Sequence, residues 1–173
     1  MSALRRRIEK LFEWISAALL VVLAVEVLIG IVFRAAGRPL VWYDEVASVL
    51  LAWVTYYASA LAALKRSHIG FPGLVNGLPP GGRIVALIVQ EVAVIGFFVV
   101  LAVWGIQVLV ALGGETLVTV DVPVRLTQSV IPIGAVLFVV AELLNLPGRI
   151  AWATGKAPPG PPAAAEAAKE LSH

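Results

Sequence analysis

The sequence of 173 residues contains no cysteine, only two histidines and few charged side chains, which make up 14% of the chain. The absence of cysteine excludes a disulfide framework, thiolate metal sites and cysteine nucleophiles. Soluble domains carry about 25% charged residues, so the low charge argues against a soluble domain. The net charge of +2 is small and dispersed, so we expect no nucleic-acid partner.

The sequence also lacks the convergent polar residues that catalysis requires. It has no Ser/His/Asp arrangement, no cluster of residues with metal-ligand spacing and no glycine-rich phosphate loop. A haem held by two histidines needs both ligands on facing helices, and neither His68 nor the terminal His173 lies in an apolar run. We therefore expect no catalytic residue, no cofactor and no metal ion in this chain.

Four apolar stretches account for most of the chain, in which 60% of the residues are hydrophobic. A helix needs about 20 apolar residues to cross a hydrocarbon layer about 30 Å thick, and each stretch is long enough. Because a single segment in lipid must satisfy its own backbone hydrogen bonds, each should be helical. The sequence predicts an all-α integral membrane protein with four transmembrane helices at about 11–33, 43–64, 84–112 and 127–148, with a kink at Pro132.

The lysines and arginines are distributed unequally between the two sides of these helices. Ten fall on one side, and only Arg34, Arg38 and Arg125 fall on the other. Because cytoplasmic loops are enriched in Lys and Arg, both termini should be cytoplasmic. Residues 1–152 would form the membrane domain, and the Pro/Ala-rich residues 153–173 a disordered cytoplasmic tail.

Polar side chains inside predicted transmembrane helices are candidates for a functional or structural role. Four such residues are predicted to act as intramembrane struts: Glu26, Glu91, Gln107 and Glu142. At a rise of about 1.5 Å per residue, Glu26 matches Gln107 in depth, while Glu91 and Glu142 share a layer nearer the cytoplasm. We interpret Glu26 as a hydrogen-bonded strut between helices; the alternative is a carboxylate that binds a proton or a cation.

The second predicted helix carries a stripe of small residues beside a stripe of aromatic ones. Small residues let another helix approach closely, so the two stripes pack either within this chain or against a larger partner. The candidates for this structural or subunit contact are Trp42, Glu45, Ser48, Ala52, Trp53 and Ser59. In the loop that follows, we expect Lys65, Arg66 and His68 to contact lipid headgroups or a partner.

Three segments together resemble the DctQ-like small membrane subunit of tripartite ATP-independent periplasmic (TRAP) transporters. Residues 42–47 (WYDEVA) resemble the start of that family's second helix, and residues 62–69 (AALKRSHI) resemble its end. Pro123 and the Ile-Pro-Ile-Gly segment at 131–134 resemble its last span. The resemblance runs from about residue 10 to 150, with the motifs in the family's order.

The resemblance implies a non-enzymatic, multi-pass subunit of the bacterial inner membrane. In this family a large elevator-type membrane subunit carries the substrate and sodium sites, and a periplasmic binding protein delivers the solute, typically an organic acid. The small subunit would widen the fixed scaffold of the large one, with membrane lipids around it. The residues expected to meet the binding protein are Arg34, Arg38, Glu115, Asp121 and Arg125.

Two other functions fit a small protein with four membrane helices. A proton-coupled exporter would use Glu26, but the Lys/Arg bias and the clustering of aromatics on the second helix oppose this interpretation. A membrane anchor for a redox complex would need paired intramembrane histidines.

Overall fold

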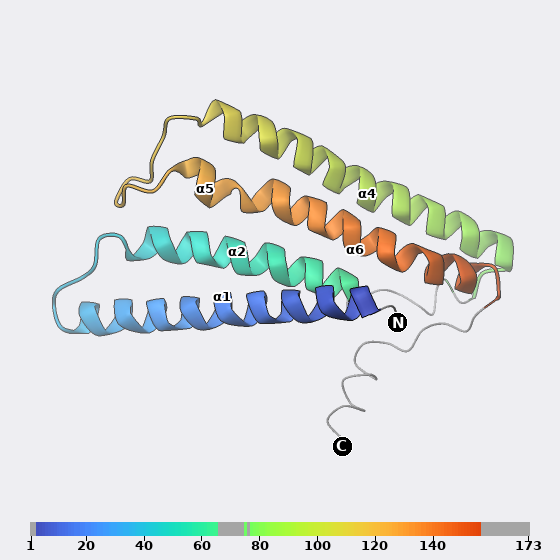
Figure 1. Ribbon diagram of the computed structural model, residues 1–173, viewed down its shortest axis with the longest axis horizontal. Helices are drawn as coiled ribbons and strands as arrows, with labels where there is room; N and C mark the ends of the chain where they lie inside the picture. The colour runs from blue at the N-terminus through green and yellow to red at the C-terminus, as the bar shows by residue number, and fades with distance from the viewer. Residues whose placement is uncertain (1–2, 66–74, 76, 157–173) are drawn as a thin grey trace, which may run out of the picture.

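The computed structural model describes residues 3–65, 75 and 77–156, which form helices joined by loops (Figure 1). The helices are α1 (Ala3–Ala35), α2 (Tyr43–Leu64), α4 (Pro80–Ala111), α5 (Val124–Gln128) and α6 (Val130–Ala153). Within this part of the chain, four segments are long and apolar enough to cross a membrane: Arg5–Ala35, Tyr43–Leu64, Gly81–Ala111 and Val124–Ala153. The prediction of an all-α chain with four such helices is confirmed. Arg66, His68 and residues 157–173 of the predicted tail lie outside the described residues.

The last membrane segment is interrupted between α5 and α6, at Ser129. Pro132 has no N–H to donate to the carbonyl of Gln128, so the regular helical bond is missing at this point. Ser129 donates instead to the carbonyl of Leu126, from its N–H at 3.4 Å and from its Oγ at 2.7 Å. The predicted kink is therefore present, as one distorted turn that begins three residues before the proline, while Ser129 itself keeps a helical backbone.

The four long helices lie side by side in one row, in the order α1, α2, α6, α4 (Figure 1). α1 packs against α2, α2 against α6, and α6 against α4, so α1 and α4 form opposite edges of the row. The small core lies between the inner helices and includes Ala63, Leu64, Phe138 and Ala141. Large aliphatic side chains on α1 and α4 remain exposed, as expected for helices that face lipid.

A glycine lies at each of the three joints of this row. A Cβ atom on Gly30 of α1 would overlap the ring of Tyr43 on α2. A Cβ atom on Gly134 of α6 would lie 2.7 Å from Cβ of Tyr56 on α2, and one on Gly105 of α4 would lie 3.3 Å from a side chain of α6. Without a hydrophobic driving force between helices, membrane proteins rely on such close packing for helix association.

Candidate functional site

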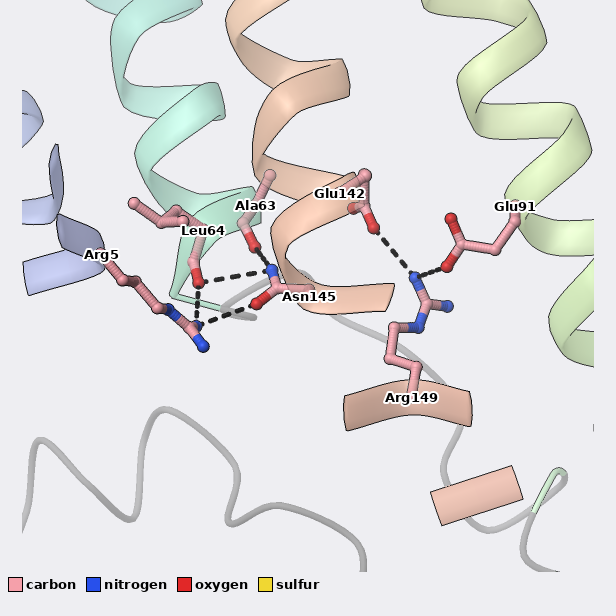
Figure 2. A network of polar contacts seen from close by, with 7 residues as sticks. All are labelled: Arg5, Ala63, Leu64, Glu91, Glu142, Asn145 and Arg149. Atoms are coloured by element: carbon pink, nitrogen blue, oxygen red, sulfur yellow. Dashed lines mark hydrogen bonds and ion pairs between the residues drawn. The ribbon is translucent and has the colours of Figure 1, made fainter. Parts of the chain in front are cut away.

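The end of the row that includes Arg5, Lys65, Arg83 and Arg149 is here called the basic end, and Figure 2 shows its polar contacts. Asn145 of α6 is only 1% exposed and donates from Nδ2 to the carbonyls of Ala63, at 2.8 Å, and Leu64, at 3.4 Å. Arg5 of α1 donates to the Leu64 carbonyl and to Asn145 Oδ1, both at 2.9 Å. The last carbonyls of a helix lack partners within that helix. Asn145 and Arg5 supply these partners and thereby join α1, α2 and α6.

A second contact at the basic end joins α4 to α6. The guanidinium of Arg149 lies between two carboxylates (Figure 2). One belongs to Glu142, about two turns earlier on α6, and the other to Glu91 on α4. Arg149 donates to Glu142 Oε2 at 2.9 Å and forms an ion pair with Glu91. The structure thus brings Glu91 and Glu142 into one layer, as the depth estimate predicted. The cation between them is Arg149, one of the ten basic residues on the richer side of the predicted topology.

Although their matching depth would allow Glu26 to meet Gln107, the structure does not bring the two side chains together. Glu26 belongs to α1 and Gln107 to α4, and these helices form opposite edges of the row (Figure 1). Gln107 is exposed, whereas Glu26 is 8% exposed and lies one turn before Gly30, which is also buried. Within the described part of the chain, neither carboxylate oxygen of Glu26 has a hydrogen-bond partner. The strut interpretation of Glu26 therefore has no partner residue to support it.

At the opposite end of the row, Glu45 holds the loop that connects α4 to α5. Its carboxylate accepts hydrogen bonds from the N–H groups of Val118, at 2.7 Å, and Thr119, at 2.8 Å, and also from the Thr119 hydroxyl. The loop is closed on itself by bonds from the N–H of Leu117 to Val122 and from the N–H of Val124 to Glu115, both at 2.9 Å. Glu45 therefore acts within the chain, and it leaves Val118 at the loop tip 94% exposed.

Replacing Glu45 with glutamine should loosen this loop. The glutamine amide nitrogen donates hydrogen bonds and does not accept them, so one of the two loop amides must lose its partner. We expect hydrogen–deuterium exchange at Val118 and Thr119 to become severalfold faster, because local opening controls exchange. A Glu115→Gln variant is the matched control, since the Glu115 side chain is exposed. Equal exchange in the two variants would contradict a clamping role for Glu45.

The other candidates on α2 divide between internal contacts and one exposed face. Trp53 donates from its indole nitrogen to the carbonyl of Thr127 at 3.0 Å, next to the break between α5 and α6, so it ties α2 to the last segment. Ser48 and Thr55 are exposed, and their hydroxyls donate at 2.7 Å to carbonyls of the preceding turn of α2. The half-buried candidates are Trp42, Ala52 and Ser59.

The charged loop candidates lie at the ends of the row. Lys65 forms ion pairs with Glu13 and, at 4.0 Å, with Glu9, so it contacts α1. The five residues expected to meet a binding protein are all exposed at the end of the row opposite the basic end. Arg38, Glu115 and Asp121 lie in loops, whereas Arg34 lies in the last turn of α1 and Arg125 in α5. Arg125 also donates to the carbonyl of Leu109 at 3.1 Å. Among the described residues, no group of three or more His, Asp or Glu side chains is placed to hold a metal ion.

Two of the residues that join the helices, Asn145 and Arg149, were not selected from the sequence. Asn145 is the one asparagine inside the fourth apolar run, three residues after Glu142. Arg149 follows Glu142 by seven residues, which is about two helical turns and places both on one face. These spacings were the available signal, but they do not reveal which neighbouring helix receives the contact.

The family model described as "Tripartite ATP-independent periplasmic transporters, DctQ component" matches residues 23–151. A comparison with curated proteins found no match. The matched range begins within α1 and ends within α6, so it includes the three joints of the row, the Glu45 clamp and the Arg149 cluster.

Proposed function

Because this chain belongs to the DctQ-component family of tripartite ATP-independent periplasmic transporters, we propose that it braces the large membrane subunit of such a transporter. The transporter would take up an organic acid, delivered by a periplasmic binding protein and coupled to sodium that binds in the large subunit alone. The chain would lie in the bacterial inner membrane with both termini in the cytoplasm, in keeping with its Lys/Arg distribution.

The observation that carries this proposal is the open row of helices. A transport pathway needs polar groups around a shared space, whereas a single row encloses none between its edge helices. The polar side chains at the basic end join neighbouring helices to one another instead (Figure 2). Such a row, with its helices linked by side-chain contacts, favours a static function. It can form a fixed support beside which a domain of another subunit moves.

The exposed face of α2 is the surface that we assign to the large subunit. It carries Ser48, Leu51 and Thr55, which recur at helical spacing, while the edges α1 and α4 expose mainly large aliphatic side chains. Small residues allow close approach of a second helix. Because the Ser48 and Thr55 hydroxyls already bond to their own backbone, burial under a partner leaves no donor unsatisfied.

A Leu51→Trp variant should weaken association with the large subunit. Leu51 is 56% exposed in the centre of this face, and a larger side chain would hold the two surfaces apart. Overpacking costs about 1–3 kcal/mol, so we expect roughly tenfold less large subunit to co-purify, together with a matching loss of solute uptake.

The matched control is Val25→Trp, which places the same ring on the free edge of α1, at a residue 50% exposed. Normal co-purification of both variants would contradict the assignment of the α2 face. The bracing function itself is tested separately: solute transport by this chain alone in liposomes would contradict it and favour an exporter that uses Glu26.

The loops opposite the basic end are the surface that we assign to the binding protein. With the helix ends beside them, they present five exposed charged residues at this end of the row: Arg34, Arg38, Glu115, Asp121 and Arg125. A binding protein that delivers solute must meet the transporter from outside, and charged groups on exposed loops favour fast, oriented encounter. The Glu45 clamp keeps one of these loops in a fixed shape, which lowers the entropy cost of binding.

A further inference from the structure

The free edge of α1 carries an ordered series of side chains that starts at the basic end. Arg7 and Lys10 are exposed, Trp14 is 75% exposed, and Val21 and Val25 follow, both at least half exposed. The spacings of 3, 4, 7 and 4 residues place all five on one helical face. This face points away from α2, because the residues of α1 that are buried lie on the other side of the helix.

The order along this edge matches the layers of a membrane leaflet. At a rise of about 1.5 Å per residue, Trp14 lies about 10 Å deeper than Arg7 along the helix axis. Cationic side chains near a membrane end reach phosphates, tryptophan favours the boundary between headgroups and acyl chains, and valine favours the hydrocarbon. A phospholipid lying along α1 would meet the three kinds of side chain in this order.

The cations on this edge are available for a ligand, in contrast to others at the basic end. Arg5 is bound to Leu64 and Asn145, and Arg149 to two carboxylates. Within the described residues, the side chains of Arg7 and Lys10 form no ion pair or hydrogen bond. The neighbouring carboxylates Glu9 and Glu13 do not compete for them, because both face Lys65.

These observations point to a lipid site, and we infer that the free edge of α1 binds an acidic phospholipid. Its phosphate would lie between Arg7 and Lys10, its glycerol region against Trp14, and one acyl chain along the valines. A phospholipid is favoured over an acidic protein surface because the edge stays aliphatic for the whole depth below Trp14. This inference goes beyond the bracing function and leaves α1 facing lipid, away from the large subunit.

The test is titration of the full-length chain, purified in a neutral detergent, with short-chain phosphatidylglycerol, followed by native mass spectrometry. We expect tighter binding of phosphatidylglycerol than of phosphatidylcholine. The double variant Arg7→Gln/Lys10→Gln should lower the affinity for phosphatidylglycerol by at least about tenfold, because each surface cation contributes to attraction by anionic lipid. Trp14→Ala should lower the affinity for both lipids by a smaller factor.

The matched control is Lys156→Gln, which removes an exposed cation just beyond α6, away from the α1 edge, and should bind phosphatidylglycerol as the unchanged chain does. Three results would overturn the inference. They are equal binding of phosphatidylglycerol and phosphatidylcholine, undiminished binding by the Arg7/Lys10 variant, and displacement of the lipid by inorganic phosphate at similar concentration. If the variant loses the large subunit while it still binds lipid, the edge is a protein contact instead.

Discussion

Replacing Arg149 with methionine should destabilise the folded chain by about 3–5 kcal/mol, because it leaves buried carboxylates without their cation. Glu91 and Glu142 are both nearly buried, and the guanidinium of Arg149 is the group that faces the two of them (Figure 2). Without it, two carboxyl groups remain close together between α4 and α6 with no cation between them. The loss of stability can be measured by thermal unfolding in detergent, followed by tryptophan fluorescence.

Two further variants separate the ion cluster from a general effect of charge. Lys156→Met removes an exposed cation just beyond α6 and should leave stability unchanged. The triple variant Glu91→Gln/Glu142→Gln/Arg149→Met should recover most of the loss, since replacement of a whole buried ion cluster by neutral groups is often close to neutral. If Arg149→Met is as stable as Lys156→Met, the cluster does not hold α4 against α6.

The parts of this fold that depend on position along a single helix could be predicted from the sequence. The four apolar runs gave the four membrane segments, because the thickness of the hydrocarbon layer sets the required length. Pro132 gave the irregularity in the last segment, because its missing N–H acts locally. The depth of a residue in the membrane depends only on its position along its own helix. The sequence therefore predicts that Glu91 and Glu142 share one layer, whichever helices pack together.

The lateral order of the helices could not be predicted in this way. Glu26 and Gln107 match in depth, but α2 and α6 lie between their helices, and four helices of similar apolarity give no signal of that order. The exact end of the last helix could not be predicted from the sequence either. The apolar run stops near residue 148, whereas α6 continues to Ala153, so Arg149 lies on the helix face of Glu142 and not in a loop.

The ion pairs and the Glu45 clamp lie at the two ends of the helices. Between these ends, the helices are held together by close packing of their side chains. The joint between α2 and α6 depends on Gly134, which lies directly against Tyr56. A methyl group at Gly134 would meet Cβ of Tyr56, which is fixed to the backbone of α2 and has no rotamer that moves it away. The two helices would have to separate, and with them the surface that α2 offers to a partner.

Gly134→Ala should therefore destabilise the chain by about 1–3 kcal/mol, which is the usual cost of overpacking. The matched control is Gly96→Ala in α4, where a Cβ atom meets nothing within 4 Å. This control should be neutral or up to about 1 kcal/mol more stable, because alanine is the better helix former. Both variants can be compared by unfolding in detergent and by recovery of the large subunit. A Gly134→Ala chain as stable as Gly96→Ala would mean that close contact at this joint does not hold the row together.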